Sequence, residues 1–165
     1  MRWDAFAEAC PQIASMAEER LRTDEVVMLG TIRPDGRPRL SPCELDFAAD
    51  RLCFGMMWQS RKALDLLRDP RLVVHSVPIG RMNPGGDIKL AGLAVEEREP
   101  VVRDLYTAVL RRRIDWAPDE PFHVFSLDVL EAAVLRFGET AAARLALRWD
   151  ETAGFTQLRH PDEPA

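Results

Sequence analysis

A series of short apolar runs separated by turn residues limits most strongly what this chain can fold into. Residues 25–32 form the first run and suit a buried strand. A Pro-Asp-Gly turn at 34–36 follows, in which proline presets φ and glycine adopts positive φ freely. Residues 37–47 are expected to return as a second strand, and a turn at 48–50 leads into a third strand at 51–57. Three strands joined by tight turns predict an antiparallel meander, the usual start of a small barrel.

The rest of the chain mixes helical patterns with further strands. Apolar residues spaced by about 3.6 positions predict a helical segment at about 3–22, broken near Pro11. Its apolar positions are Trp3, Phe6, Ala7, Ile13, Ala17 and Leu21. Further helices are expected at 60–68 and 100–113, and further strands at 71–77, 87–97, 121–127, 131–136, 144–149 and 155–159. Gly92, inside a strand pattern, predicts a bulge or a close backbone approach. We expect one domain over residues 1–165, α+β and mainly β, with the barrel at about 25–160.

Composition and charge argue against several classes of protein. The chain has 165 residues, 47% of them hydrophobic, which is enough for one sizeable core and not for two. A net charge of −5, with no basic block beyond residues 111–113, argues against nucleic-acid binding. No apolar run approaches the roughly 20 residues of a membrane span, and the N-terminus lacks a secretory signal. Cys10, Cys43 and Cys53 lack metal-type spacing, so we expect free thiols, no metal site and a cytoplasmic location.

Ser60, Arg61 and Lys62 lie where a strand-like run ends and a helix-like run begins. The free N–H groups and the positive dipole end of a helix favour anions, and Arg and Lys side chains bind phosphate oxygens. Cations at this end of a helix oppose the dipole, and a bound anion is one way to resolve that conflict. The triplet therefore predicts an anion site. The alternative is that Ser60 is an ordinary N-cap residue and both cations are only solvated.

Four segments, in this order and spacing, resemble the pyridoxamine 5′-phosphate oxidase-like proteins, the FMN-binding split-barrel family. They are LGTIRPDGRPRLSP at 29–42, FGMMWQSRKA at 54–63, LRDPR at 67–71 and GDIKLAGLA at 86–94. The first is similar to the opening hairpin of the family and the second to its phosphate-binding strand and turn. The other two are similar to the end of the following helix and to the next strand. The resemblance is good over residues 25–98 and loose beyond.

The resemblance implies a split β-barrel with peripheral helices, usually a homodimer with its cofactor sites between the subunits. It implies FMN as the cofactor, with a deazaflavin coenzyme as the alternative and FAD or haem in a few relatives. It assigns the cofactor phosphate to Ser60, Arg61 and Lys62. The further cofactor-binding positions that it implies are Arg39, Leu40, Ser41, Gly55 and Met56.

Two departures from the family limit what carries over. Authentic oxidases have a Lys near the position of Cys43 and Glu44, and an Arg-Leu-His-Asp-Arg type of segment near the C-terminus; this chain has neither. We therefore expect a flavin- or deazaflavin-dependent oxidoreductase acting on a small organic substrate, and not the vitamin B6 reaction. The cofactor ring would carry the chemistry, so no catalytic residue is assigned. The alternative is a split-barrel protein that holds a flavin or haem without turnover.

Lys89 is an additional candidate for the cofactor site, because it lies on the fifth expected strand beside a glycine-rich loop. A solvent-facing strand position is the alternative. Residues 81–83 of that loop are candidates for the rim of a substrate cleft. Met56, Met57 and Trp58 suit contact with an aromatic, polarisable cofactor, and core packing or a dimer interface is the alternative for them.

Overall fold

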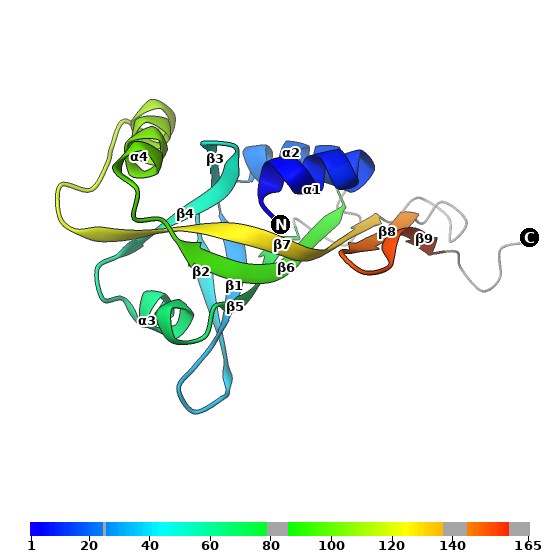
Figure 1. Cartoon of the computed structure of the whole chain (residues 1–165), viewed down its shortest axis with the longest axis horizontal. Coiled ribbons are helices and arrows are strands. Elements are labelled where there is room, and N and C mark those ends of the chain that lie inside the picture. Colours follow the sequence, from blue (N-terminus) through cyan, green and yellow to red (C-terminus); the bar gives the residue numbers. More distant parts are fainter. Residues whose placement is uncertain (25, 79–85, 137–144, 159–165) are drawn as a thin grey trace, which may run out of the picture.

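The computed structural model describes residues 1–24, 26–78, 86–136 and 145–158 (Figure 1). The helices are α1 (Trp3–Ala9), α2 (Pro11–Thr23), α3 (Arg61–Arg68) and α4 (Pro100–Ile114). The strands are β1 (Val27–Ile32), β2 (Pro38–Cys43), β3 (Asp46–Ala48), β4 (Arg51–Met57), β5 (Arg71–Ser76), β6 (Asp87–Glu96), β7 (Phe122–Arg136), β8 (Leu145–Asp150) and β9 (Gly154–Leu158). These elements confirm the predicted class, α+β and mainly β.

The described strands join in one antiparallel sheet that has the predicted split-barrel arrangement. Its path runs β2-β1-β5-β6-β7-β4-β3, and β8 and β9 continue it from the C-terminal half of β7. In Figure 1, β6 and β7 cross the middle of the molecule, α1 and α2 lie on one side of them and α3 on the other. α4 lies at the end away from the β8–β9 hairpin. No helix within the described residues is long and apolar enough to cross a membrane.

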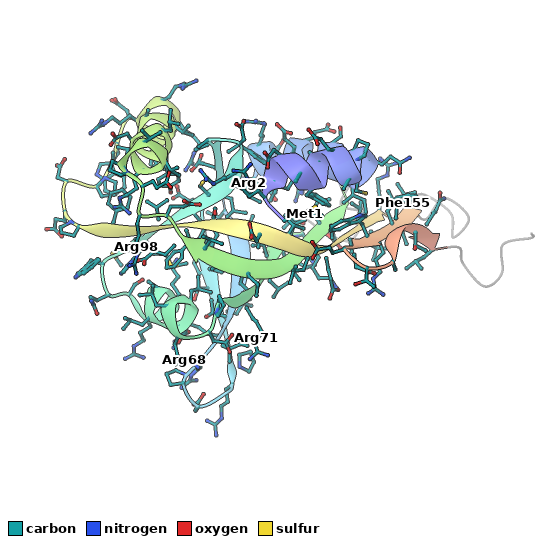
Figure 2. All side chains as sticks on the ribbon, in the orientation of Figure 1. Met1, Arg2, Arg68, Arg71, Arg98 and Phe155 are labelled. Carbon is teal, nitrogen blue, oxygen red and sulfur yellow. The ribbon has the colours of Figure 1, made fainter. Side chains whose placement is uncertain are left out.

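The two N-terminal helices pack into the core as their apolar pattern predicts. Pro11 begins α2, because proline lacks an N–H and suits the first helical turn. The buried members of the predicted stripe are Trp3, Phe6, Ile13, Ala17 and Leu21. Phe6 packs edge-on against Trp149 of β8, with ring centroids 5.0 Å apart. Met1 lies beside β7 in Figure 2, where its ammonium group donates to the Val129 carbonyl at 2.8 Å.

The β1–β2 hairpin forms as its turn residues predict. Gly36 has a φ of 80°, and its N–H donates to the carbonyl of Arg33 at 2.9 Å. The register places Gly30 opposite Leu40. Because β2 ends the path of the sheet, this hairpin puts Arg39 on an outer strand.

The predicted meander of three strands is wrong. Segment 37–47 breaks into β2 and β3, and β4 pairs with β3 and β7 instead of with β2. Ala49 and Asp50 both have positive φ, 51° and 58°, which is the conformation of a tight hairpin turn, so the chain reverses directly from β3 into β4. The local turn was predictable, whereas the pairing of β4 with β7 depends on residues about 70 positions away in the sequence.

The strands predicted at 121–127 and 131–136 are one strand, the 15-residue β7. The break in its apolar pattern coincides with a shift in the register of β6 and β7 beside Gly92. A Cβ atom at position 92 would lie 1.9 Å from the carbonyl oxygen of Asp128. The predicted irregularity at Gly92 is therefore confirmed, and it explains why one strand has the pattern of two.

Candidate functional site

A tight turn at residues 57–60 leads from β4 into α3. The Ser60 N–H donates to the Met57 carbonyl at 3.1 Å, and Gln59 adopts a φ of 58°. A non-glycine residue with this left-handed backbone costs conformational energy and persists only where its surroundings hold it. Ser60 returns to an extended conformation, and its carbonyl accepts from Leu64 N–H at 2.9 Å to begin the helix.

The Ser60 side chain does not cap α3, although Ser60 occupies the N-cap position. It makes no capping hydrogen bond, and its Oγ is buried without a partner among the described residues. A buried hydroxyl that lacks a partner costs about 1–3 kcal/mol. The ordinary N-cap interpretation therefore does not describe Ser60, whose hydroxyl is left with unused hydrogen-bonding capacity beside the free N–H groups of the helix.

The two cations of the triplet differ in their surroundings. Lys62 Nζ donates to the Pro42 carbonyl at 2.8 Å, which ties α3 to β2 and leaves two ammonium protons for other acceptors. Arg61 is exposed and makes no hydrogen bond or ion pair with another described residue. Its guanidinium is therefore available to an anion at this end of the helix.

Arg39, one of the predicted cofactor-binding positions, is engaged within the chain. Its Nε donates to Asp65 Oδ2 of α3 at 2.6 Å, and Thr31 Oγ1 donates to the same oxygen at 2.9 Å. Burial by itself raises the pKa of Asp65, but the hydrogen bonds from Arg39 and Thr31 outweigh it and hold that pKa below its ordinary value. Arg39 thus holds the β1–β2 hairpin against α3. Neighbouring Leu40 is exposed and Ser41 is half-buried on the same strand.

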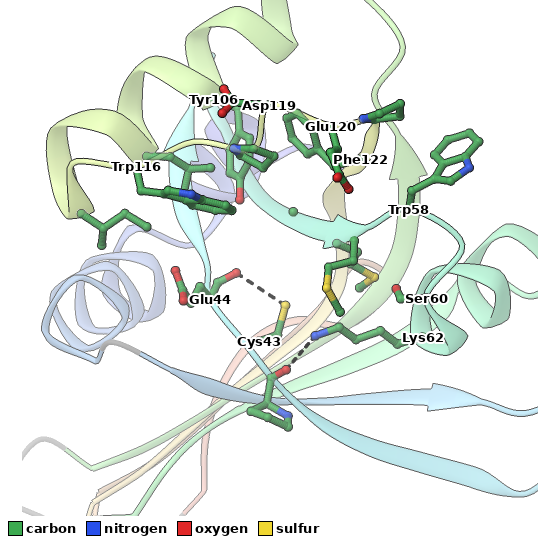
Figure 3. A pocket seen from close by; sticks show the side chains of 18 of the residues that line it. Cys43, Glu44, Trp58, Ser60, Lys62, Tyr106, Trp116, Asp119, Glu120 and Phe122 are labelled. Carbon is green, nitrogen blue, oxygen red and sulfur yellow. Dashed lines mark hydrogen bonds between the residues drawn. The ribbon is translucent and has the colours of Figure 1, made fainter.

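A cavity of about 900 Å³ opens beside the turn and is lined largely by apolar side chains. Four of the predicted cofactor positions line it: Gly55, Met56, Ser60 and Lys62. In Figure 3, Ser60 and Lys62 lie on one side, and the aromatic side chains of Tyr106, Trp116 and Phe122 lie across from them. The cavity therefore has a polar, basic end at α3 and a largely apolar, aromatic remainder that also includes the carboxylates of Glu44, Asp119 and Glu120. Arg39, Leu40, Ser41 and Arg61 are not among its lining residues.

Gly55 has a reason within the chain for its lack of a side chain. A Cβ atom there would lie 2.7 Å from Tyr106 Oη of α4. Tyr106 is buried, and burial raises the pKa of its phenol. The Tyr106 hydroxyl is therefore neutral and packs over β4. No local sequence pattern indicates this contact, because α4 is far from β4 along the chain.

Lys89 lies apart from this cavity. It is exposed on β6 and lines a second, smaller cavity of about 460 Å³, together with residues of β7, β8 and β9 such as Glu131 and Arg148. The single chain does not bring Lys89 to Ser60 and Lys62, so its role in a cofactor site stays a prediction. Residues 81–83, proposed as a substrate rim, lie outside the described residues.

Arg113, the last of three arginines at the end of α4, makes ion pairs that the composition did not suggest. Arg113 Nε donates to Asp46 Oδ1 at 2.7 Å, and Arg113 also pairs with Glu44 at 2.5 Å. The charge of Glu44, which stands near the position where authentic oxidases have a Lys, is therefore balanced by Arg113 of α4.

Trp116 and Phe122, which line the aromatic side of the cavity, were not predicted from the sequence, because they belong to no local motif.

The cysteines offer no nucleophile at this site. Cys43 lines the cavity, but its burial raises the pKa of the thiol to about 11, so it stays protonated at neutral pH. All three cysteines are free and buried. The described residues hold no group of three His, Cys, Asp or Glu side chains that could bind a metal.

The protein is similar to known proteins in its three-dimensional structure. No family model and no curated protein matches the sequence. Among solved structures, PhzG from Burkholderia lata in complex with tetrahydrophenazine-1-carboxylic acid aligns over 95% of this chain and 93% of its own, at 18% identity and a TM-score of 0.64. A pyridoxamine 5′-phosphate oxidase-related, FMN-binding protein from Nostoc punctiforme aligns over 94% and 96%, at 17% identity and a TM-score of 0.61.

A haem-binding protein from Mycobacterium smegmatis aligns over 79% of this chain and 57% of its own, at 19% identity and a TM-score of 0.55. Likenesses at such identities establish the fold and leave the ligand and reaction to the site itself. The alignments with PhzG and the Nostoc protein cover nearly the whole of each chain. The chain therefore has the split-barrel fold of the pyridoxamine 5′-phosphate oxidase-like proteins, as its sequence motifs predicted.

Proposed function

We propose that this protein is an oxidoreductase that binds a flavin-type cofactor, with the cofactor phosphate at the N-terminus of α3. The observation that carries the proposal is the Ser60 hydroxyl, which is buried at the basic end of the large cavity and has no partner among the described residues. A phosphate oxygen at this position would accept from Ser60 Oγ, from the free N–H groups of α3 and from Lys62. Arg61, which has no partner among the described residues, adds a second cation. These residues fit a phosphate monoester.

The remainder of the cavity fits the rest of such a cofactor. Its volume of about 900 Å³ and its apolar, aromatic lining match the cavities that hold ligands of this size. Met56, Tyr106 and Phe122 would pack against an extended ring system and exclude water from it. A bound flavin supplies the electron-transfer chemistry, and the residues of the chain bind it, orient it and keep it dry.

The cofactor proposed is FMN, and a deazaflavin coenzyme is the alternative, because both present a phosphate to the same basic turn. The related protein from Nostoc punctiforme is an FMN-binding protein, which supports FMN. The substrate proposed is a small organic molecule that the cofactor ring reduces or oxidises. No side chain at the cavity is assigned an acid–base role.

The cavity also supports a homodimer. Met57, Trp58 and Trp116 line it, yet they are 79%, 55% and 57% exposed in the single chain. Large apolar side chains exposed next to one another mark an interaction site. A second copy of the chain would cover them and close the open side of the cavity. Light scattering should then give twice the chain mass, and replacing Met57 with Glu should lower both the mass and the cofactor affinity.

A split-barrel protein that binds haem or flavin without turnover is the second candidate. The haem-binding protein from Mycobacterium smegmatis, which shares the fold, favours it. Neither of the described histidines, His75 and His123, lines the large cavity, so haem would lack an axial histidine there from the described residues. Flavin binding is therefore the better supported of the two.

Cofactor titration distinguishes these candidates. The purified protein should show a flavin or deazaflavin spectrum, or bind FMN more tightly than riboflavin, which lacks the phosphate. Arg61→Ala and Lys62→Ala should each weaken FMN binding by roughly tenfold to a hundredfold, because each removes a charge-assisted bond to phosphate. Equal affinity for FMN and riboflavin, or wild-type affinity in both variants, would place the phosphate elsewhere. Reduction of a bound cofactor by a donor, followed by transfer to a substrate, would separate the enzyme from the binding protein.

A further inference from the structure

His123 is a buried polar side chain directly beneath the turn that precedes α3. It lies on β7 opposite Met56 of β4, and only 3% of it is exposed. Its Nδ1 lies 3.0 Å from Glu96 Oε1, and the backbone N–H of Gln59 donates to its Nε2 at 3.4 Å. The indole ring of Trp58 stacks on the imidazole, with centroids 4.5 Å apart and planes 9° from parallel. Two successive residues of the turn thus contact one side chain.

The partners of His123 define its tautomer. Burial by itself raises the pKa of Glu96, but the hydrogen bonds from His123 and Arg98 outweigh it, so the pKa of Glu96 lies below its ordinary value and Glu96 is a carboxylate. Arg98, labelled in Figure 2, donates to the other Glu96 oxygen at 2.7 Å. A carboxylate only accepts, so His123 Nδ1 carries the proton. Nε2 is then free to accept from Gln59, as a neutral imidazole does.

The hydrogen bond between His123 and Gln59 involves the residue of the turn that has a left-handed backbone conformation. Gln59 has the left-handed φ of 58° in the turn, a position that usually favours Gly or Asn. The bond is long and therefore weak alone, but the stacked Trp58 ring holds the residue before it as well. Ser60, whose hydroxyl has no partner within the described part of the chain, comes next in the sequence, so the conformation at Gln59 helps to place that hydroxyl.

We propose that His123, oriented by Glu96, is a positioning residue for the phosphate-binding turn: its neutral Nε2 and its ring face hold Gln59 and Trp58 so that Ser60 Oγ and the N-terminus of α3 meet the phosphate. This proposal rests on the proposed cofactor function for its ligand and on the contacts of His123 for its geometry. It adds a residue that contacts neither the cavity nor the phosphate.

Three substitutions separate the contacts of His123. His123→Gln places an acceptor close to the position of Nε2, His123→Asn keeps a polar group near Nδ1 only, and His123→Phe keeps the ring and removes both hydrogen bonds. FMN affinity should stay within about threefold of wild type in the Gln variant and fall about tenfold in the Asn and Phe variants. Riboflavin affinity should change in none of them, since it has no phosphate. His75→Gln, on β5, is the matched control and should bind FMN normally.

A second measurement needs no cofactor. Hydrogen exchange of the Gln59 amide should be slow in the wild type and in His123→Gln, and faster in His123→Asn and His123→Phe, at equal overall stability by thermal melting. If that amide exchanges equally fast in all four proteins, or if affinity follows melting temperature and not the presence of the acceptor, His123 only stabilises the fold and the proposal is wrong. If the four proteins show the expected exchange pattern but the wild type binds no phosphate ligand, the positioning holds and the proposed cofactor function fails.

Discussion

Two regions around α3 differ in whether their polar side chains have hydrogen-bond partners among the described residues. Inside the helix, Asp65 accepts from Arg39 and Thr31, and this buried network is closed. One turn earlier, the Ser60 hydroxyl is buried with no partner among the described residues and Arg61 is exposed. Arg39, Thr31 and Ser60 belong to segments that resemble one cofactor-binding family. The difference shows that an Arg in such a motif can be engaged within the fold, while the Ser60 hydroxyl has no partner among the described residues.

The largest expected effect comes from opening the closed network. Asp65→Ala should lower the free energy of unfolding by about 3 kcal/mol, because it leaves the buried Thr31 hydroxyl and the half-buried Arg39 guanidinium without their acceptor. Urea denaturation measures this. Asp65→Asn, which keeps one acceptor oxygen, is the control and should lose less. An Asp65→Ala protein as stable as the wild type would mean that the network contributes nothing.

The same network should make stability depend on pH. The pKa of Asp65 in the folded chain lies below its ordinary value of 3.8, so its contribution is present above that value and is lost as the pH falls through the folded pKa. Thermal melting across the acidic range should therefore show a steeper loss of stability below about pH 4 in the wild type than in Asp65→Asn. Parallel curves for the two proteins would contradict the assignment.

Ser60→Ala should differ from Asp65→Ala: it should lower FMN affinity without lowering stability. Removing a buried hydroxyl to which none of the described groups bonds should leave stability unchanged or raise it by up to about 1 kcal/mol. FMN affinity should fall about tenfold, since the phosphate loses one donor. Melting temperature and cofactor titration on the same samples provide the comparison. A variant that loses stability and keeps its affinity would show that Ser60 has a structural role after all.

Arg61→Ala is expected to have the smallest effect on the fold. The side chain is exposed and has no partner among the described residues, so the free energy of unfolding should change by less than about 0.5 kcal/mol. Any loss of FMN affinity in this variant then reports on the ligand alone. A clear loss of stability, seen by urea denaturation, would reveal a contact of Arg61 within the folded protein.

The parts of the fold that were predicted correctly depend on neighbours in the sequence. The hairpin turn needs only its own Pro-Asp-Gly residues, and α3 begins after a turn and ends before a proline. Gly92 was recognised as irregular because glycine is unusual within a strand pattern. The meander was predicted wrongly because tight turns specify a reversal of the chain but not which strand will lie on the other edge.

The candidate site was predicted in part for the same reason. Ser60 and Lys62 reach the cavity because they are next to the turn that carries them. The contact between Gln59 and His123 spans 64 residues, and that between Arg113 and Asp46 spans 67. No local pattern encodes such contacts, so neither His123 nor Arg113 was identified as part of the site.

From the order of residues alone follow the helices and most of the strands, the class of fold and the place of a basic turn before α3. Local backbone preferences and apolar periodicity act over a few residues, and they suffice for these features. Whether a polar group in that turn is paired depends on the elements that pack against it. Asp65 reaches Arg39 across the β1–β2 hairpin, Glu96 orients His123 beneath the turn, and no described group reaches the Ser60 hydroxyl. Hydrogen bonds need partners within about 3 Å, and only the folded chain brings distant residues that close.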